Sequence, residues 1–343
     1  MSQPIILAIE SSCDDTSAAV IRGSEILSNV AATQAIHNDY GGVVPELASR
    51  AHQQNIVPVV QQALRQANIG KKDISAIGFT RGPGLLGSLL VGTSFAKSLA
   101  MSLSVPLIEV NHLQAHILAH FIADANPEPL KFPFLCLTVS GGHTMIVLVK
   151  DFFEMQIIGR TTDDAAGEAF DKIGKIFGLD YPAGPIIDRL AKSGTPEFQF
   201  GKPKLDGYDY SFSGIKTSVL YFIQKQLKDN PNFIAENLNN LCASVQKAIV
   251  EILMEKLEKA AKDLNINEVA IAGGVSANSE LRTAMKENQQ KLGWEIYIPK
   301  FEYTTDNAAM IAMVAQLKFA RRDFADLEVS ATARYDFAKD FEN

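Results

Sequence analysis

Near the N-terminus the chain reads Ile5-Ile6-Leu7-Ala8-Ile9-Glu10-Ser11-Ser12-Cys13-Asp14-Asp15-Thr16-Ser17-Ala18-Ala19-Val20-Ile21. Two apolar runs flank a polar turn, and this pattern predicts a β-hairpin whose tip carries hydroxyl groups. The same order returns in residues 134–149, where the turn is Ser140-Gly141-Gly142-His143-Thr144. Two copies of one hairpin so far apart in the chain indicate an internal duplication.

Helix and strand patterns alternate after each hairpin. Helical patterns cover residues 45–67, 85–103, 167–177, 215–228, 233–264 and 278–291, and strand patterns cover 74–80, 106–110 and 268–272. Strands that are followed by alternating helices and strands are typical of α/β domains. The sequence therefore predicts one α/β domain in each half of the chain.

A turn-forming segment rich in proline, residues 124–129, lies between the two halves. We therefore expect a first domain over residues 1–128 and a second domain over residues 129–343. It is left open whether the final helix, 307–322, packs back on the first domain. In a duplicated protein of this kind we expect the ligand to bind in a cleft between the domains.

Composition narrows the class of protein. The 343 residues suit two domains of ordinary size, and three widely spread cysteines argue against a disulfide framework or a cysteine-based zinc site. A formal net charge of −7 argues against binding nucleic acid through bulk electrostatics. The N-terminal pattern is no signal peptide, and Lys97 and several serines interrupt the apolar stretch 85–105. We therefore expect a cytoplasmic protein without a membrane contact.

Two histidines, His112 and His116, are spaced four residues apart in a helical context. This spacing places both imidazoles on one helical face, and a distant carboxylate such as Asp306 can complete a metal site with open positions. The zinc-peptidase motif needs a glutamate directly after the first histidine, where this chain has Leu113. The pattern favours a Lewis-acid centre over a peptidase, with ordinary core or surface histidines as the alternative.

Glycine-rich turns occur in three places: Gly82-Pro83-Gly84-Leu85-Leu86-Gly87, Ser140-Gly141-Gly142-His143 and Gly273-Gly274-Val275-Ser276-Ala277-Asn278. Glycine allows backbone N–H groups to approach a phosphate closely. The first turn matches a dinucleotide fingerprint, which makes a dehydrogenase a competitor, but Pro83 removes one N–H from it. Residues 87–94 resemble a P-loop but have Thr93 where lysine is required.

Taken in order along the chain, these motifs resemble those of the glycoprotease-related TsaD family. The matching segments are Ile9-Glu10-Ser11-Ser12-Cys13-Asp14-Asp15-Thr16, residues 82–89, His112 with His116, residues 140–144, residues 163–172, residues 273–278 and Thr305-Asp306-Asn307. The resemblance implies the duplicated actin, hexokinase and Hsp70-like α/β fold, with a nucleotide cleft between two domains. It also implies an enzyme that makes N6-threonylcarbamoyladenosine in tRNA.

The resemblance implies particular site residues. His112, His116 and Asp306 would bind one divalent metal ion, with Fe²⁺ favoured and Zn²⁺ as the alternative. The nucleotide-linked substrate would contact Val139, Ser140, Gly141, Gly142, His143, Asp171, Gly184, Asp188 and Asn278. Structural alternatives stay open for two of these: Asp171 as a partner of Lys172 or Lys175, and Gly184 as the start of a helix after Pro182.

The implied reaction moves the threonylcarbamoyl group from threonylcarbamoyl-AMP to N6 of the adenosine beside the anticodon, in tRNAs that read ANN codons, and releases AMP. The metal would polarise the carbamoyl carbonyl or anchor the threonyl part. Asp14 or Asp15 would accept the proton, with turn formation as the alternative role of both.

The expected partners are the tRNA anticodon loop, a TsaB-like paralogue and a TsaE-like ATPase. The apolar segment 117–122 is either a partner surface or part of the core, and the core is favoured. Two other functions are weighed against transfer: a small-molecule kinase or ATPase of the same fold, and a metallopeptidase.

Overall fold

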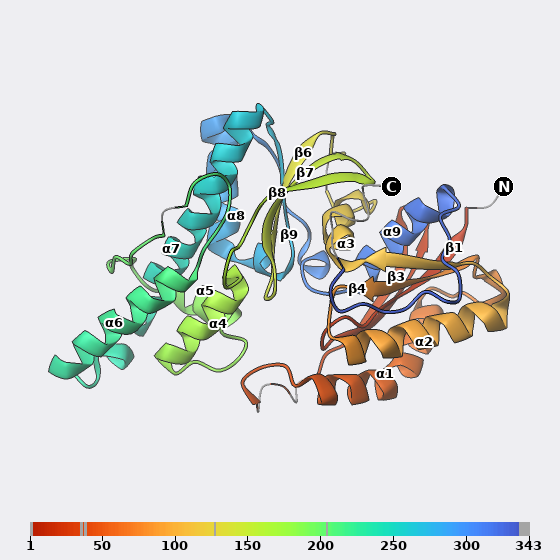
Figure 1. Cartoon of the computed structure of the whole chain (residues 1–343), viewed down its shortest axis with the longest axis horizontal. Helices are drawn as coiled ribbons and strands as arrows, with labels where there is room; N and C mark the ends of the chain where they lie inside the picture. Colours follow the sequence, from red (N-terminus) through yellow and green to blue (C-terminus); the bar gives the residue numbers. More distant parts are fainter. Residues whose placement is uncertain (1–2, 35–36, 38–39, 127, 204, 336–343) are drawn as a thin grey trace. The chain divides into compact units, whose positions relative to one another are not determined.

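The computed structural model describes residues 3–34, 37, 40–126, 128–203 and 205–335 (Figure 1). It divides into two compact units, the first formed by residues 1–130 with 299–343 and the second by residues 131–298. The division differs from the expected boundary at one end, because the last segment of the chain belongs to the first unit and not to the second. The final helix explains this difference and is described below.

The first unit is built around a mixed sheet. Among the described residues its strands, in spatial order, are β3 (Glu25–Ala32), β2 (Thr16–Arg22), β1 (Ile5–Glu10), β4 (Ala76–Gly82) and β5 (Leu107–Asn111). β1 pairs antiparallel with β2, as the hairpin pattern predicts, and parallel with β4. The polar turn therefore lies at the edge of the sheet where β1 and β4 end.

The second unit repeats this plan. Its described strands, in spatial order, are β10 (Glu295–Tyr297), β9 (Glu268–Ala272), β6 (Phe134–Val139), β7 (Thr144–Asp151) and β8 (Glu154–Arg160). β6 pairs antiparallel with β7 and parallel with β9, as β1 does with β2 and β4. The predicted duplication of an α/β unit is confirmed.

Helices cover the sheets. They are α1 (Pro45–Gln66), α2 (Leu86–Leu103), α3 (His112–Leu118) and α9 (Ala308–Ala320) in the first unit, and α4 (Ala166–Phe177), α5 (Ala183–Ala191), α6 (Ser213–Asp229), α7 (Phe233–Leu264) and α8 (Ser279–Leu292) in the second. In the first unit, α1 and α2 pack on one face of the sheet (Figure 1). Leu7 and Ile9 of β1 contribute to the core on that face, because alternate strand residues point to the same side.

Helix α9 packs on the other face of the first sheet, against β1, β2 and β4. The absence of a side chain at Gly78 permits this approach, since a Cβ there would lie 2.7 Å from the Cβ of Ala315. Every residue from Ala308 to Ala315 is buried. A helix that is apolar on all sides is stable only in an interior, and this sheet face supplies one.

Helix α2 is the one helix in the described ranges that is long and apolar enough to cross a membrane by length and composition. Its buried side of Ser88, Leu89, Thr93 and Ala96 packs against α1 and β4. We interpret α2 as a helix of the first unit, because one side of it packs in the core of that unit, while Leu86, Leu90 and Met101 are exposed.

Candidate metal centre and substrate loops

The two histidines lie on α3, which begins directly after β5. Asn111 caps this helix: its Oδ1 accepts hydrogen bonds from the backbone N–H groups of Leu113 at 2.9 Å and Gln114 at 3.1 Å. The imidazoles of His112 and His116 are one turn apart, with ring centroids 4.8 Å apart and planes at 89°. A local signal, a strand end followed by an asparagine cap, thus fixes the pair on one helical face.

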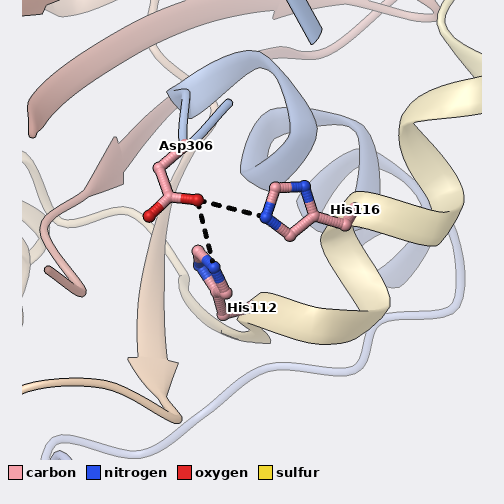
Figure 2. Close-up of side chains that lie close together, drawn as sticks. All are labelled: His112, His116 and Asp306. Atoms are coloured by element: carbon pink, nitrogen blue, oxygen red, sulfur yellow. Dashed lines mark hydrogen bonds and ion pairs between the residues drawn. The ribbon is translucent and has the colours of Figure 1, made fainter. Parts of the chain in front are cut away.

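Asp306 approaches the pair from the loop before α9. Its Oδ1 lies 3.1 Å from Nε2 of His116 and 3.4 Å from Nε2 of His112 (Figure 2). Bonds of about 2.1 Å to a tetrahedral ion place neighbouring ligand atoms about 3.4 Å apart. The two distances to Asp306 suit a shared metal ion, and the three ligand atoms lie within 4.8 Å of one another. Each residue presents an atom that a divalent transition metal accepts.

A fourth residue, Glu10, belongs to this cluster and was not predicted from the sequence. It is the last residue of β1 and is fully buried. Its Oε2 lies 3.1 Å from Nδ1 of His112 and accepts a hydrogen bond from Oγ1 of Thr80 at 2.5 Å, while its Oε1 accepts from the backbone N–H of Ser12. The available signal was the position of Glu10 directly after the apolar run of residues 5–9, which allows it to be the last residue of the buried strand β1.

The cluster stabilises a positive charge. Burial by itself lowers the pKa of His112, but the carboxylates of Asp306 and Glu10 outweigh burial and hold this pKa well above its usual value. Burial alone would raise the pKa of Asp306, and His112 with His116 instead holds it well below its usual range. Two carboxylates that stay ionised around the histidines form a site that a divalent cation can neutralise.

The acidic turn lies beside this cluster. Burial, assisted by the charge of Asp14, raises the pKa of Asp15 to about 6, and Asp306 and Glu10 act on Asp15 in the same direction. Oδ1 of Asp15 is buried and has no hydrogen-bond partner among the described residues. A carboxyl group with this pKa exchanges a proton readily near neutral pH, so Asp15 suits the predicted role of base better than an ordinary turn residue does.

His52 of α1 forms hydrogen bonds to both ends of the acidic turn. Its Nε2 lies 3.0 Å from the carbonyl oxygen of Cys13, and its Nδ1 lies 2.7 Å from Oγ1 of Thr16. Burial lowers the pKa of His52, so the ring is neutral at physiological pH. The neutral ring donates its Nε2 proton to Cys13 and accepts from Thr16, which ties both ends of the turn to α1.

The two glycine loops of the second unit start at the same edge of its sheet. Residues 140–143 follow β6 and residues 273–278 follow β9, and these strands are parallel neighbours. A Cβ added to Gly141 or Gly142 would meet no atom within 4 Å, so this turn faces open space. Gly167, in the first turn of α4, donates its N–H to the carbonyl oxygen of Ser140 at 3.2 Å. The start of a helix and an open glycine turn are thus side by side, an arrangement that suits an anion.

Several predicted substrate contacts also hold the second unit together. Oδ1 of Asp171 accepts from the N–H of Ala183 at 2.8 Å, and Oδ1 of Asp188 accepts from the N–H and Oγ of Ser279 at 2.9 and 2.6 Å. Asn278 caps α8 through Leu281 at 3.1 Å. These bonds fix the starts of α5 and α8 beside the glycine loops.

The structure bears on two alternatives that the sequence left open: the pairing of Asp171 with a lysine, and the position of Gly184 at the start of a helix. Lys172 pairs with Asp164 at 2.7 Å and with Glu168 at 2.9 Å, so the proposed pairing of Asp171 with Lys172 is wrong. Gly184 does lie in the first turn of α5 after the cap residue Pro182, which confirms its helix-start geometry.

The remaining predicted contacts lie at the first glycine loop of the second unit. Val139 is buried at the end of β6. The half-exposed His143 donates its backbone N–H to Oγ of Ser140 at 3.1 Å, which closes the turn.

The glycine loop that resembles a dinucleotide fingerprint has a packing role. A Cβ on Gly84 would lie 2.4 Å from the carbonyl oxygen of Ser12, and one on Gly82 would lie 2.0 Å from that of Thr332. The N–H of Leu85 donates to the carbonyl oxygen of Ser12 at 2.7 Å. These glycines admit neighbouring backbone, so the structure gives the dehydrogenase hypothesis no support.

Comparison with known proteins identifies the family. The model of the TsaD family, tRNA N6-adenosine threonylcarbamoyltransferase, matches residues 25–313. The chain belongs to the TsaD family. A tRNA N6-adenosine threonylcarbamoyltransferase of Riemerella anatipestifer is 79% identical over 98% of this chain and 99% of that protein, and one of Christiangramia forsetii is 63% identical over 97% and 98%.

Solved structures agree on the fold. HypF in its phosphate- and nucleotide-bound form has a TM-score of 0.60 at 13% identity, over 94% of this chain and 47% of HypF. Component A of the (R)-2-hydroxyglutaryl-CoA dehydratase of Acidaminococcus fermentans has a TM-score of 0.51 at 15% identity, over 93% of this chain and all of that one. Both support the duplicated fold of the actin and hexokinase class, as expected from the sequence.

Membership of the TsaD family makes this protein a transferase that modifies tRNA. The comparisons give no support to the kinase or the metallopeptidase. The cluster of His112, His116 and Asp306, which could hold a metal ion, is then the feature of the structure that most directly bears on mechanism.

Proposed function

We propose that this protein transfers the threonylcarbamoyl group from threonylcarbamoyl-AMP to N6 of the adenosine beside the anticodon, in tRNAs that read ANN codons, and releases AMP. The cluster of His112, His116 and Asp306 in a chain of this family is the observation that carries the proposal. The target base lies in a single-stranded loop, from which a base can be splayed out at modest cost.

The cluster would hold one divalent metal ion, Fe²⁺ by preference and Zn²⁺ as the alternative. When bound, the ion supplies Lewis-acid chemistry that polarises the carbamoyl carbonyl or anchors the threonyl part. Spacings of 3.1 and 3.4 Å between the ligand atoms support this assignment. Nitrogen and oxygen donors of this kind also suit both metals.

The AMP part of the substrate would bind to the second unit. The open turn at Gly141 and Gly142 offers backbone N–H groups to the phosphate, with the start of α4 beside it. Asn278, Asp171 and Asp188 would contact the adenosine through the hydrogen-bonding capacity that remains after their bonds to α5 and α8. Val139, Ser140, His143 and Gly184 would complete the surface of this site.

Asp15 would accept the proton that N6 loses during attack. Its pKa of about 6 leaves it ionised at neutral pH and basic enough to take up a proton. Asp14 would assist, because its charge raises the pKa of its neighbour. The base and the Lewis acid would then act from adjacent parts of the first unit.

A TsaB-like paralogue and a TsaE-like ATPase are the proposed partners, and the cytoplasm is the proposed location. An apolar surface on α2 supports a protein partner: Leu86, Leu90 and Met101 are 48%, 47% and 62% exposed. The segment 117–122 does not supply such a surface, since Ile117, Leu118 and Ile122 are buried.

Complementation in cells depleted of this protein tests the proposal, because native partners are present there. We expect the wild type to restore threonylcarbamoyladenosine in tRNA, measured by nucleoside mass spectrometry. His116→Gln should lower the transfer rate at least about 100-fold, because polarisation contributes several kcal/mol and each 1.4 kcal/mol is tenfold. The purified variant should also lose bound metal in elemental analysis.

His120→Gln is the matched control, since His120 is also buried and lies one turn after His116 but outside the cluster. It should keep both metal and modification. An unchanged level of modified tRNA after depletion would contradict the proposed reaction, and a fully active His116→Gln protein without metal would contradict the metal centre.

A further inference from the structure

We propose that Glu10 is a positioning residue of the metal centre: its carboxylate keeps a proton on Nδ1 of His112 and thereby directs the Nε2 lone pair toward the ion. This inference rests on the ligand set proposed above. It concerns a residue that touches neither the substrate nor the ion, and that acts through His112.

The contacts of Glu10 leave little freedom for its side chain. Oε2 accepts from Oγ1 of Thr80 on β4 and faces Nδ1 of His112 on α3, and Oε1 accepts from the N–H of Ser12 in the turn. Three separate elements therefore hold one fully buried carboxylate. An ionised carboxylate accepts hydrogen bonds and donates none, so Nδ1 of His112 must be the donor in this pair.

The tautomer of His112 matters because an imidazole has two nitrogens and only an unprotonated one can bind a metal. Nε2 of His112 is the nitrogen that faces Asp306, at 3.4 Å, while Nδ1 faces Glu10 on the opposite side of the ring. The two carboxylates thus define both the orientation of the ring and the role of each nitrogen. A carboxylate on the far nitrogen also makes a histidine a more basic metal ligand.

Ser12 and the first glycine loop support this arrangement. Ser12 places its Oγ 3.2 Å from Nδ1 of His112, next to Glu10. The carbonyl oxygen of Ser12 is in turn fixed by the N–H of Leu85, and the absence of a side chain at Gly84 makes room for it. The first glycine loop therefore supports the residues around His112.

The internal duplication shows that the fold does not require an acid at this position. Glu10 pairs with Ser17 at the end of the β1–β2 ladder, and Val139 pairs with Thr144 at the same end of the β6–β7 ladder. Val139 is therefore the counterpart of Glu10. The described part of the second unit holds no group of metal-ligand side chains, and there the position is apolar. A buried carboxylate is costly unless it is used, so its presence in the first unit points to the histidine it contacts.

Zinc affinity tests the role of Glu10 without reference to the transfer reaction. We expect Glu10→Gln in the full chain to bind Zn²⁺ about 10- to 100-fold more weakly than the wild type in competition with a chromophoric chelator. Glu109→Gln is the matched control: Glu109 is a carboxylate on β5 that pairs with Arg81 at 2.9 Å, away from the cluster. It should bind zinc as the wild type does.

A second measurement needs no variant of Glu10 and decides the matter if Glu10→Gln does not fold. In the zinc-loaded wild type labelled with ¹⁵N-histidine, NMR should show a slowly exchanging proton on Nδ1 of His112, assigned by its loss in His112→Gln. Wild-type affinity in Glu10→Gln, or zinc bound to Nδ1, overturns the proposal. Failure of the ligand set is distinguishable from both, since His116→Gln would then bind zinc as tightly as the wild type.

Discussion

The turn between β1 and β2 carries the carboxylates of Asp14 and Asp15, whereas the corresponding turn between β6 and β7 carries Gly141 and Gly142. Both turns follow a strand of six residues that pairs with one antiparallel and one parallel neighbour. Carboxylates favour protons and cations, whereas bare backbone N–H groups favour anions. One backbone plan therefore supports two sites of opposite charge preference.

The residues around the two turns also differ. At the first turn, the neutral ring of His52 donates to the carbonyl oxygen of Cys13 and so bonds to the backbone of the turn. Beside the second turn, Gly167 in the first turn of α4 donates its N–H to Ser140, so the positive end of a helix adjoins the glycines. The chemistry of each site thus comes from residues placed on the fold and not from the fold itself.

Of the changes at the two turns, the largest effect is expected from removing the proposed base in the first turn. Asp15→Asn should slow transfer about 100-fold, because a positioned base contributes at least that factor. In the wild type the rate should fall about tenfold per pH unit below pH 6 and level off above it, since a base is active only when deprotonated and the pKa of Asp15 is about 6. Single-turnover assays across pH measure both.

Asp14→Asn is the control for this pH dependence. The charge of Asp14 raises the pKa of Asp15, so its removal should move the falling part of the profile to lower pH without abolishing it. A profile for Asp15→Asn that still falls below pH 6 would show that another group is the base.

The next effect is on stability, and it concerns the contact between the loop after β9 and the end of β6, directly before the second turn. Gly273 has φ +85°, and a Cβ there would lie 2.5 Å from the carbonyl oxygen of Val139. Gly273→Ala should therefore lower the free energy of unfolding by about 1–3 kcal/mol in chemical denaturation. Gly274→Ala is the matched control, because a Cβ at Gly274 meets no atom within 4 Å, and it should leave stability unchanged. Equal stability of the two variants would contradict this close approach of the loops.

The smallest effect concerns ligand binding at the second turn alone. Gly142→Val should weaken AMP binding about tenfold, equal to about 1.4 kcal/mol, because the new side chain occupies the open space in front of the turn. The melting temperature should not change, since the fold leaves that space empty. Calorimetry on the series of glycine, alanine and valine at this position should show an effect that grows with side-chain size. Unchanged affinity across the series would place the nucleotide elsewhere.

Much of the fold was predictable because its signals are local. The two hairpins follow from apolar runs around polar turns, and the helices from their periodicity. The predicted helix over 307–322 exists as α9, but its membership of the first unit depended on which sheet face lacked a cover. A sequence boundary drawn at residues 124–129 cannot show that the chain returns to the first unit at residue 299.

The candidate site was predictable in part. The spacing of His112 and His116 is a local signal. Asp306 was proposed as a distant carboxylate that could complete the site, and the family resemblance implied the same residue, whereas Glu10 was missed. The bond of Asp171 to Ala183 was not predicted, because it joins two helices that sequence patterns treat separately.

The amino-acid sequence alone determined the elements and their chemistry: two hairpins, glycines at one tip, carboxylates at the other, and two histidines on one helical face. These features depend on side-chain periodicity and turn geometry over a few residues. Only the tertiary structure decided which distant residues meet. Glu10 reaches His112 across 102 positions and Asp306 reaches His116 across 190, and no local preference encodes such contacts. They exist because sheet pairing and the burial of α9 bring those parts of the backbone together.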